Sequence, residues 1–198
     1  MDDWTTDQTL IQGSDAWRAA RRRRVGGSDI GVILRMSKYK TRRELWEEMT
    51  GRREVPNIGA LPHVMRGTLA EPIARGMLER ELGVKYATPV LVHPVHAWAV
   101  ASFDGVTTDH TLEIKTMSAK AHAAREITPA YRAQCLWGLA VSGKARCLFA
   151  SYRPEDGTLW HEWIMRDPEW EVEALARAAE FMEWVESDAM PEEYVYVG

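Results

Sequence analysis

The amino-acid sequence predicts an α/β fold in which a mixed central sheet of about five strands is flanked by helices on both faces. The spacing of apolar residues is helical up to residue 82 and changes to a period of two from residue 90. It becomes helical again between the strands and at the C-terminal end. A strand-rich middle region enclosed by helices is typical of a sheet that is covered on both faces.

The composition fits one globular domain over residues 1–198. Apolar residues make up 45% of the chain and charged residues 27%, a balance that allows a core and excludes a disordered or collagen-like protein. The two cysteines, Cys135 and Cys147, are too few for a disulfide framework and too far apart for a Cys-x-x-Cys metal motif.

Four helices are expected before residue 83, with the ranges 16–24, 28–34, 41–49 and 68–82. Ser28 is the expected N-cap of the second helix, and Thr41 with Glu44 forms a capping box for the third. Pro72 is tolerated in the fourth helix because it falls in the expected first turn. The Pro- and Gly-containing stretch 51–62 is expected to be a loop within the domain.

Alternating apolar residues predict strands at 90–92, 98–102, 112–115, 145–151 and 159–165. Helical segments at 118–125 and 129–142 separate the third strand from the fourth, and Thr128 and Gly143 are expected to bound the second of them. A final helix is expected from Asp167 to about Glu186, with one apolar face.

Charge is distributed unevenly along the chain. The formal net charge of −4 argues by itself against a nucleic-acid-binding protein. However, the stretch from Arg18 to Arg43 has ten basic residues and one acid, a charge of +9. The stretch from Glu155 to Glu193 has thirteen acids and two arginines, a charge of −11. Such a chain has a basic surface that can hold a polyanion and an acidic end that repels one.

The sequence contains no signal for a membrane. No stretch approaches the roughly 20 consecutive apolar residues of a membrane span. Residues 1–10 are polar and acidic, whereas a signal peptide is basic and then apolar. We therefore expect a cytoplasmic protein that has no membrane partner.

The residues most informative about chemistry are Asp104, in the sequence SFDG, and Glu113 and Lys115, in the sequence LEIK. Side chains alternate along a strand, so Glu113 and Lys115 share one face, and a hairpin would bring Asp104 to the same point. Two carboxylates and a carbonyl such as that of Ile114 suit Mg²⁺ or Mn²⁺. Lys115 can orient or deprotonate a water, or stabilise charge on a phosphodiester. The alternative is an edge-strand ion pair of Glu113 with Lys115 beside an Asp-Gly turn.

Two further polar residues lie on the apolar faces of predicted helices. Glu71 shares its face with Ala74 and Leu78, and Gln134 lies on a face formed by apolar residues. A polar group directed toward the core needs hydrogen-bonding partners. An active site would supply them, and so would a local buried hydrogen bond.

Five segments together carry a resemblance to a known family: 21–30, which contains GGSDI; 65–72, MRGTLAEP; 101–105, ASFDG; 112–116, LEIKT; and 131–134, YRAQ. They resemble the YqaJ-type viral recombinase family, which includes the phage lambda-type alkaline exonuclease and belongs to the PD-(D/E)XK nuclease superfamily. The resemblance spans about residues 17–143 and implies a restriction-endonuclease-like form of the α/β fold. Phe103 stands where many members have a proline, at a position that supplies no ligand.

The resemblance implies a metal-dependent 5′-to-3′ exonuclease on linear double-stranded DNA that releases mononucleotides and leaves a 3′ single strand for recombination. It implies that Asp104, Glu113 and the Ile114 carbonyl hold Mg²⁺, that Glu71 holds a second Mg²⁺ through water, and that Lys115 acts on the attacking water. Mn²⁺ would be the substitute ion. The implied 5′-phosphate pocket consists of Arg21, Ser28, Ser102 and Gln134; the neighbouring Arg22, Arg23 and Arg24 are open as alternatives to Arg21.

The resemblance also implies a homotrimeric ring around DNA, a single-strand annealing protein as partner, and a phage or prophage origin in a bacterial cell. Two alternatives are open. A structure- or site-specific endonuclease of the same superfamily would need no 5′-phosphate pocket. A non-catalytic DNA-binding protein on this fold would have no use for a carboxylate cluster, which repels phosphate unless a metal ion is bound.

Overall fold

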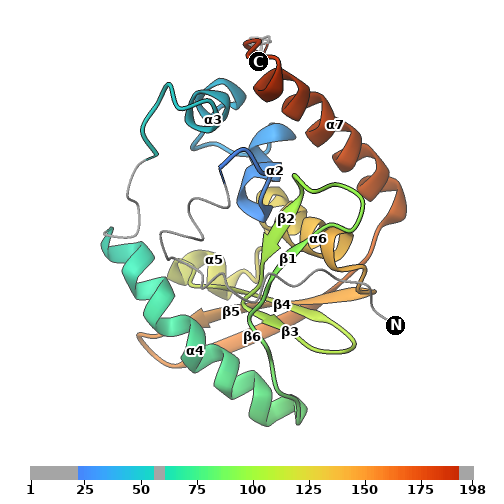
Figure 1. The fold of residues 1–198 in the computed structure, drawn as a ribbon. Coiled ribbons are helices and arrows are strands. Elements are labelled where there is room, and N and C mark those ends of the chain that lie inside the picture. The colour runs from blue at the N-terminus through green and yellow to red at the C-terminus, as the bar shows by residue number, and fades with distance from the viewer. Residues whose placement is uncertain (1–21, 56–60, 192–198) are drawn as a thin grey trace.

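The computed structural model describes residues 22–55 and 61–191 and confirms the predicted α/β fold (Figure 1). A mixed four-stranded sheet has the order β3-β4-β5-β6, and β1 and β2 form a separate antiparallel pair. In the larger sheet, β4 and β5 are parallel, and the other neighbours are antiparallel. The strands are β1 Val90–Val92, β2 Val100–Ser102, β3 Gly105–Val106, β4 Thr111–Lys115, β5 Arg146–Arg153 and β6 Thr158–Met165.

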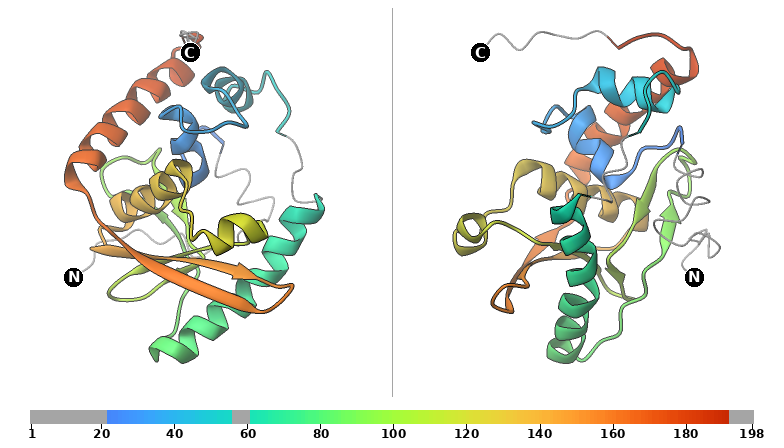
Figure 2. Two further views of the ribbon diagram at one scale, coloured as in Figure 1. Left: turned by 180° about the vertical axis from the view of Figure 1, so that it is seen from behind. Right: turned by 90° about the vertical axis from the view of Figure 1, so that its left-hand side faces the viewer.

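The helices lie in three places around the sheets (Figures 1 and 2). One long helix, α4, runs along the four-stranded sheet. Helices α5 and α6 connect β4 to β5 and pack against β5. Helices α2, α3 and α7 lie together at the other end of the molecule. Their bounds are α2 Gly27–Ile33, α3 Arg42–Met49, α4 Pro62–Leu82, α5 Ala119–Ala123, α6 Pro129–Ser142 and α7 Pro168–Glu186. Among the described helices, none combines the length and the apolar composition needed to cross a bilayer.

The two faces of β4 are buried against different helices. Leu112 and Ile114 pack in a cluster with Ala74 and Leu78 of α4. On the neighbouring strand β5, Phe149 pairs with Glu113 in parallel register and packs against α6 on the opposite face. The predicted alternation along this strand is therefore confirmed, and Glu113 is held on the α6 side.

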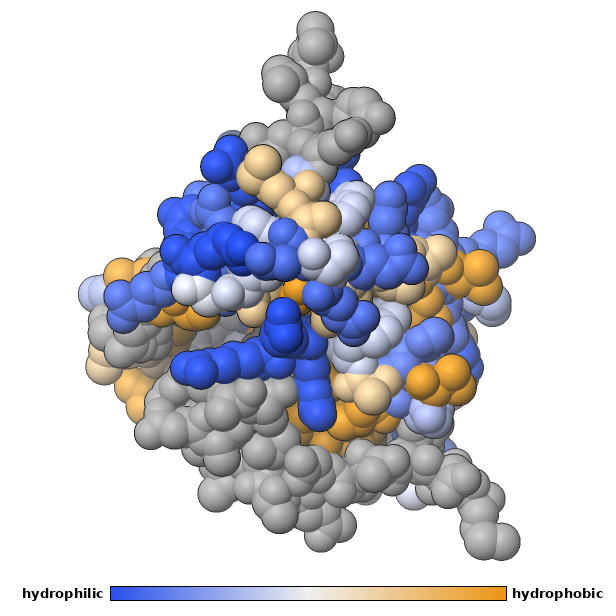
Figure 3. All heavy atoms as spheres, turned by 45° about the horizontal axis from the view of Figure 1, so that its top comes forward, coloured by the Kyte–Doolittle hydropathy of each residue, from blue (hydrophilic) through white to orange (hydrophobic). Residues whose placement is uncertain are grey.

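The two charged stretches of the sequence meet in the structure. Helix α7 packs on α2 and α3, the guanidinium of Arg42 lies 4.5 Å from the ring centroid of Trp184, and Arg23 Nη2 donates to the Val185 carbonyl at 3.2 Å. Hydrophilic residues cover most of the face on which these helices lie (Figure 3). The expectation of separate basic and acidic surfaces is therefore wrong for these arginines, because part of the basic stretch packs against the acidic helix.

The strands form two sheets and not one. The chain leaves β2 at Ser102 and enters β3, which the sequence did not predict, only after Phe103 and Asp104. The strand expected from residue 98 begins at Val100; before it, Ala99 forms an isolated parallel bridge with Val25. Asp104 therefore lies at the corner between the two sheets, where its backbone does not follow either ladder.

Two expected helix starts are wrong. Gly26, and not Ser28, is the N-cap of α2, because the Asp29 carboxylate accepts a hydrogen bond from the Gly26 amide at 2.9 Å. Helix α4 starts at Pro62, six positions before the expected Thr68, so Pro72 lies inside the helix and not in its first turn. The first expected helix falls mostly outside the described residues; of its last three positions, 22 and 23 form a turn and 24 is not helical.

Gly105 is expected to resist substitution because a side chain there would collide with Tyr86. A Cβ atom at Gly105 would lie 2.6 Å from Tyr86 Cδ1 and 2.8 Å from Tyr86 Cγ. Tyr86 is buried, and its hydroxyl is fixed at 2.7 Å from His110 Nε2. We expect Gly105→Ala to lower the free energy of unfolding by about 1–3 kcal/mol, measured by urea denaturation.

The matched control is Gly76→Ala, in the interior of α4. Its Cβ would approach only the flexible end of Arg80, at 3.7 Å from Nη1. Alanine is favoured over glycine in a helix by up to about 1 kcal/mol, so this change is expected to stabilise the protein. Equal stability of both variants would show that the Tyr86 contact does not constrain the corner.

Candidate active site

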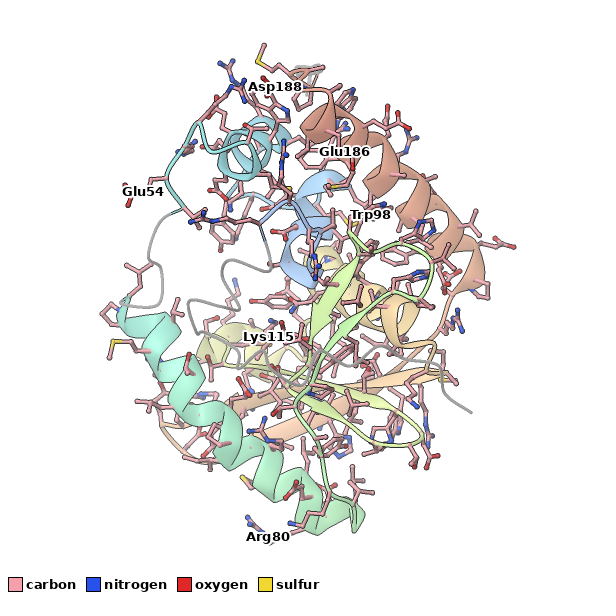
Figure 4. All side chains as sticks on the ribbon, viewed as in Figure 1. Glu54, Arg80, Trp98, Lys115, Glu186 and Asp188 are labelled. Atoms are coloured by element: carbon pink, nitrogen blue, oxygen red, sulfur yellow. The ribbon has the colours of Figure 1, made fainter. Side chains whose placement is uncertain are left out.

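A cavity of about 370 Å³ opens between α2, α4 and the ends of β2 and β4. Figure 4 places Lys115, the last residue of β4, near the middle of the molecule. Helix α4 approaches the end of β4 closely, since a Cβ atom at Gly67 would lie 3.1 Å from Thr116 Oγ1. Ile114 lines this cavity. So do seven of the eight side chains that the sequence identified as candidate site residues: Ser28, Glu71, Ser102, Asp104, Glu113, Lys115 and Gln134. The eighth, Arg21, lies outside the described residues.

Asp104 is buried at the corner between the two sheets, with 9% of its surface exposed. Its Oδ2 accepts a hydrogen bond from the Ile114 amide at 2.7 Å, which fixes the carboxylate beside β4. Burial first, and then the negative charges of Glu113 and Glu71, raise the pKa of Asp104 well above its ordinary value. The surroundings of Asp104 therefore disfavour its ionised form as long as no metal ion is bound.

Glu113 and Lys115 form an ion pair on the same face of β4. The Lys115 Nζ lies 2.6 Å from Glu113 Oε1, and the ammonium group lies 5.2 Å from the ring centroid of Tyr131 on α6. Burial acts to lower the pKa of Lys115, but the carboxylates of Glu113 and Asp104 outweigh it, so the pKa is raised. In the metal-free protein Lys115 is therefore a cation at neutral pH. Because both residues line the cavity, this ion pair is not merely an edge-strand contact.

Glu71 faces the cavity from α4, with its side chain 24% exposed. Arg75, one helical turn further on, was not singled out in the sequence. Its Nη1 donates both to Glu71 Oε1, at 2.9 Å, and to the backbone carbonyl of Asp104, at 2.6 Å. The spacing of an acid four positions before a base was the available sequence signal for the first of these contacts.

The cavity lining also contains neutral polar groups. Ser102 is the last residue of β2, and Ser28 lies in the first turn of α2. Gln134 of α6 packs over the start of α2, because a Cβ atom at Gly27 would lie 3.1 Å from Gln134 Cγ. The structure thus brings Ser28, Ser102 and Gln134 to the same cavity as the charged residues. These groups can hold an anion without adding positive charge near the carboxylates.

The donor set fits a hard divalent cation. Within the described ranges there is no group of three or more His, Cys, Asp or Glu side chains arranged to hold a metal ion. The protein would therefore supply two carboxylates, from Asp104 and Glu113, and the main-chain oxygen of Ile114, with water completing the coordination. That is a set typical of Mg²⁺ or Mn²⁺ and not of Zn²⁺, which prefers nitrogen and sulfur ligands.

Comparison with known proteins identifies relatives in sequence. The model of the YqaJ-like viral recombinase domain matches residues 16–145. The uncharacterized protein YqaJ of Bacillus subtilis (strain 168) is 32% identical over 164 residues, which cover 78% of this chain and 51% of that protein. The chain thus spans about half the length of this curated relative.

Solved structures of two exonucleases share the fold. The alkaline exonuclease LHK-Exo from Laribacter hongkongensis superposes with a TM-score of 0.77 at 25% identity, over 89% of this chain and 94% of that one, and its complex with dAMP matches equally. A phage-related exonuclease from Haemophilus somnus 129PT superposes with a TM-score of 0.64 at 11% identity, over 83% of this chain and 96% of that one.

Proposed function

Since the chain belongs to the YqaJ-like viral recombinase family, we propose that it is a metal-dependent 5′-to-3′ exonuclease acting on linear double-stranded DNA. The observation that carries the proposal is the shared cavity, whose lining combines a carboxylate cluster and an adjacent lysine with neutral polar side chains. A non-catalytic DNA-binding protein would have no use for a buried carboxylate such as Asp104, whose pKa is raised by burial and by neighbouring carboxylates. In this proposal residues 1–198 form one nuclease domain.

In the proposed reaction, Asp104, Glu113 and the Ile114 carbonyl would hold one Mg²⁺, and Glu71 would hold a second through water, with Mn²⁺ as the substitute ion. The bound ions would lower the pKa of the attacking water and neutralise charge on the phosphodiester. In the metal-free protein Lys115 is an ammonium group, because the carboxylates around it raise its pKa. Beside bound metal ions it would act on the attacking water and stabilise negative charge on the phosphodiester.

In this proposal the neutral polar side chains of the cavity select the 5′ end. A terminal phosphate has more negative charge and more free oxygen acceptors than a bridging one, so hydroxyl and amide donors from Ser28, Ser102 and Gln134 favour it. Arg21 would add a bidentate contact. Anchoring of the terminal phosphate beside the carboxylates would place the adjacent phosphodiester at the site of hydrolysis.

The rest of the proposal depends on the family likeness alone. The products would be 5′-mononucleotides and a 3′ single strand, which a single-strand annealing protein would take over in recombination. The enzyme would form a homotrimeric ring around its substrate and work in the cytoplasm of a bacterium that carries a phage or prophage.

The test is digestion of linear duplexes with 5′-phosphate or 5′-hydroxyl ends, with Mg²⁺ or with EDTA, beside a covalently closed circle. We expect Mg²⁺-dependent release of mononucleotides from the phosphorylated duplex, slower digestion of the hydroxyl-ended duplex, and an intact circle. For Gln134→Ala and Arg21→Ala we expect a selective loss of about 10-fold on phosphorylated ends, the size of one lost charged hydrogen bond.

Each other outcome assigns a different function. Cutting of the closed circle would indicate an endonuclease of the same superfamily. Binding of DNA without cleavage, with any divalent metal ion, would indicate a non-catalytic protein. An equal loss by both variants on phosphate and hydroxyl ends would assign Gln134 and Arg21 to general backbone binding.

A further inference from the structure

Arg75 donates hydrogen bonds to two different parts of the fold. A single nitrogen, Nη1, bridges the carboxylate of Glu71 on α4 and the backbone carbonyl of Asp104 at the corner between the sheets. The Arg75 side chain is 19% exposed, and both hydrogen bonds are partly buried. An ordinary i,i+4 ion pair on a helix surface contributes only a few tenths of a kcal/mol. The second acceptor, 29 positions away in sequence, indicates a role beyond helix stability.

Asp104 is held from both sides as a result. Its carboxylate accepts from the Ile114 amide at 2.7 Å, and its carbonyl accepts from Arg75 at 2.6 Å. Because Asp104 lies outside both ladders, its buried carbonyl depends on Arg75 for this hydrogen bond and not on a neighbouring strand. The same guanidinium sets where the Glu71 carboxylate lies relative to Asp104.

Charge alone cannot account for this arrangement in a site that binds cations. A fixed positive group beside the carboxylates repels an incoming metal ion. The charge of Arg75 therefore lowers the affinity for a metal ion. If Arg75 nevertheless favours metal binding, it must do so by holding the carboxylate ligands in place. The two possibilities predict opposite signs: loss of Arg75 tightens metal binding if repulsion dominates and weakens it if positioning dominates.

We propose that Arg75 is a positioning residue that couples Glu71 and Asp104, so that the two carboxylates have the separation that divalent metal binding requires. This inference rests on the proposed function, because it assumes that these carboxylates bind metal. Groups that hold metal ligands in place typically change metal affinity or activity by about 10–100-fold when they are removed.

The experiment measures Mn²⁺ binding to the full chain without DNA, by titration calorimetry or by the electron paramagnetic resonance signal of free Mn²⁺. For Arg75→Ala we expect binding weaker by about 10-fold or more. We also expect a higher Mg²⁺ concentration for half-maximal nuclease activity, and recovery of part of the rate at high Mg²⁺. The matched control is Arg80→Ala, which removes the same charge from an exposed position of the same helix and is expected to leave Mn²⁺ binding unchanged.

Arg75→Lys is the second variant, and it also serves if Arg75→Ala does not fold. Lysine keeps the charge, but its shorter side chain ends before the position of Nη1, so we expect Mn²⁺ binding between that of Arg75→Ala and that of the unaltered protein. Unchanged or tighter binding in Arg75→Ala, or full binding in Arg75→Lys, would overturn the positioning role.

The Mn²⁺-binding experiment tests the role of Arg75 separately from the proposed exonuclease function. A protein that binds Mn²⁺ but does not degrade DNA would contradict the exonuclease proposal, and the effect of Arg75 on Mn²⁺ binding would still decide the inference. An unaltered protein that binds no Mn²⁺ would overturn both.

Discussion

Replacement of Glu113 with glutamine is expected to reduce nuclease activity by at least about 100-fold, because a metal ion supplies several kcal/mol of transition-state stabilisation. Glutamine has the shape of glutamate but lacks its charge, so the metal loses a ligand while the packing on the α6 side of β4 is kept. The same change removes the ion partner of Lys115, which lies 2.6 Å from Glu113 Oε1. The measurement is the initial rate of mononucleotide release from a 5′-phosphorylated linear duplex at saturating Mg²⁺.

The matched control for this prediction is Glu162→Gln on β6. Glu162 is the antiparallel register partner of Phe149, so it lies two strands away from Glu113 in the same sheet, with its side chain 53% exposed. We expect full activity in the control and an unchanged circular dichroism spectrum in both variants. A Glu113→Gln protein with more than a tenth of the normal rate would remove Glu113 from the proposed metal site.

The sequence predicts the elements of this fold better than their connections. Strand alternation correctly placed Leu112 and Ile114 on one face of β4, because a buried strand has a period of two whatever covers it. The separation of the β1–β2 pair from the larger sheet was not predicted, because it depends on the backbone direction at Asp104. Local patterns give no information about that direction.

In the candidate site, too, contacts between residues that are far apart in sequence could not be predicted. The motifs identified Glu71, and its helical face was predicted, but the hydrogen bond from Arg75 to the Asp104 carbonyl depends on how α4 lies against the sheets.

The position of Cys135 and Cys147 in the cavity lining was likewise not predictable from their spacing in the sequence. Their spacing excludes a Cys-x-x-Cys motif, yet both are buried and line the cavity, and a thiol hydrogen bond to Cys147 together with burial raises the pKa of Cys135. A protonated thiol is a poor metal ligand, which agrees with an oxygen-ligand site.

Replacement of Asp104 with asparagine is expected to abolish activity and yet stabilise the metal-free protein. Burial, followed by the charges of Glu113 and Glu71, raises the pKa of Asp104 above the ordinary value of 3.8. The folded protein therefore binds the Asp104 proton more tightly than the unfolded chain. This contribution to stability is present at low pH and is lost as the pH rises through the folded-state pKa. Asparagine cannot ionise, and its amide oxygen can still accept from the Ile114 amide.

Thermal unfolding in EDTA over a series of pH values measures the effect. We expect the melting temperature of Asp104→Asn to exceed that of the unaltered protein at pH 8, with a difference that shrinks as the pH is lowered toward 4. For a chain of this length, each kcal/mol changes the melting temperature by about 2–4 °C. Mg²⁺ should raise the melting temperature of the unaltered protein and have little effect on the variant, since it binds only the folded ionised site. A variant less stable than the unaltered protein at every pH would mean that Asp104 is a structural residue whose charge the fold already compensates. If the stability gain appears together with loss of activity, the buried carboxylate is retained for metal binding at the expense of stability.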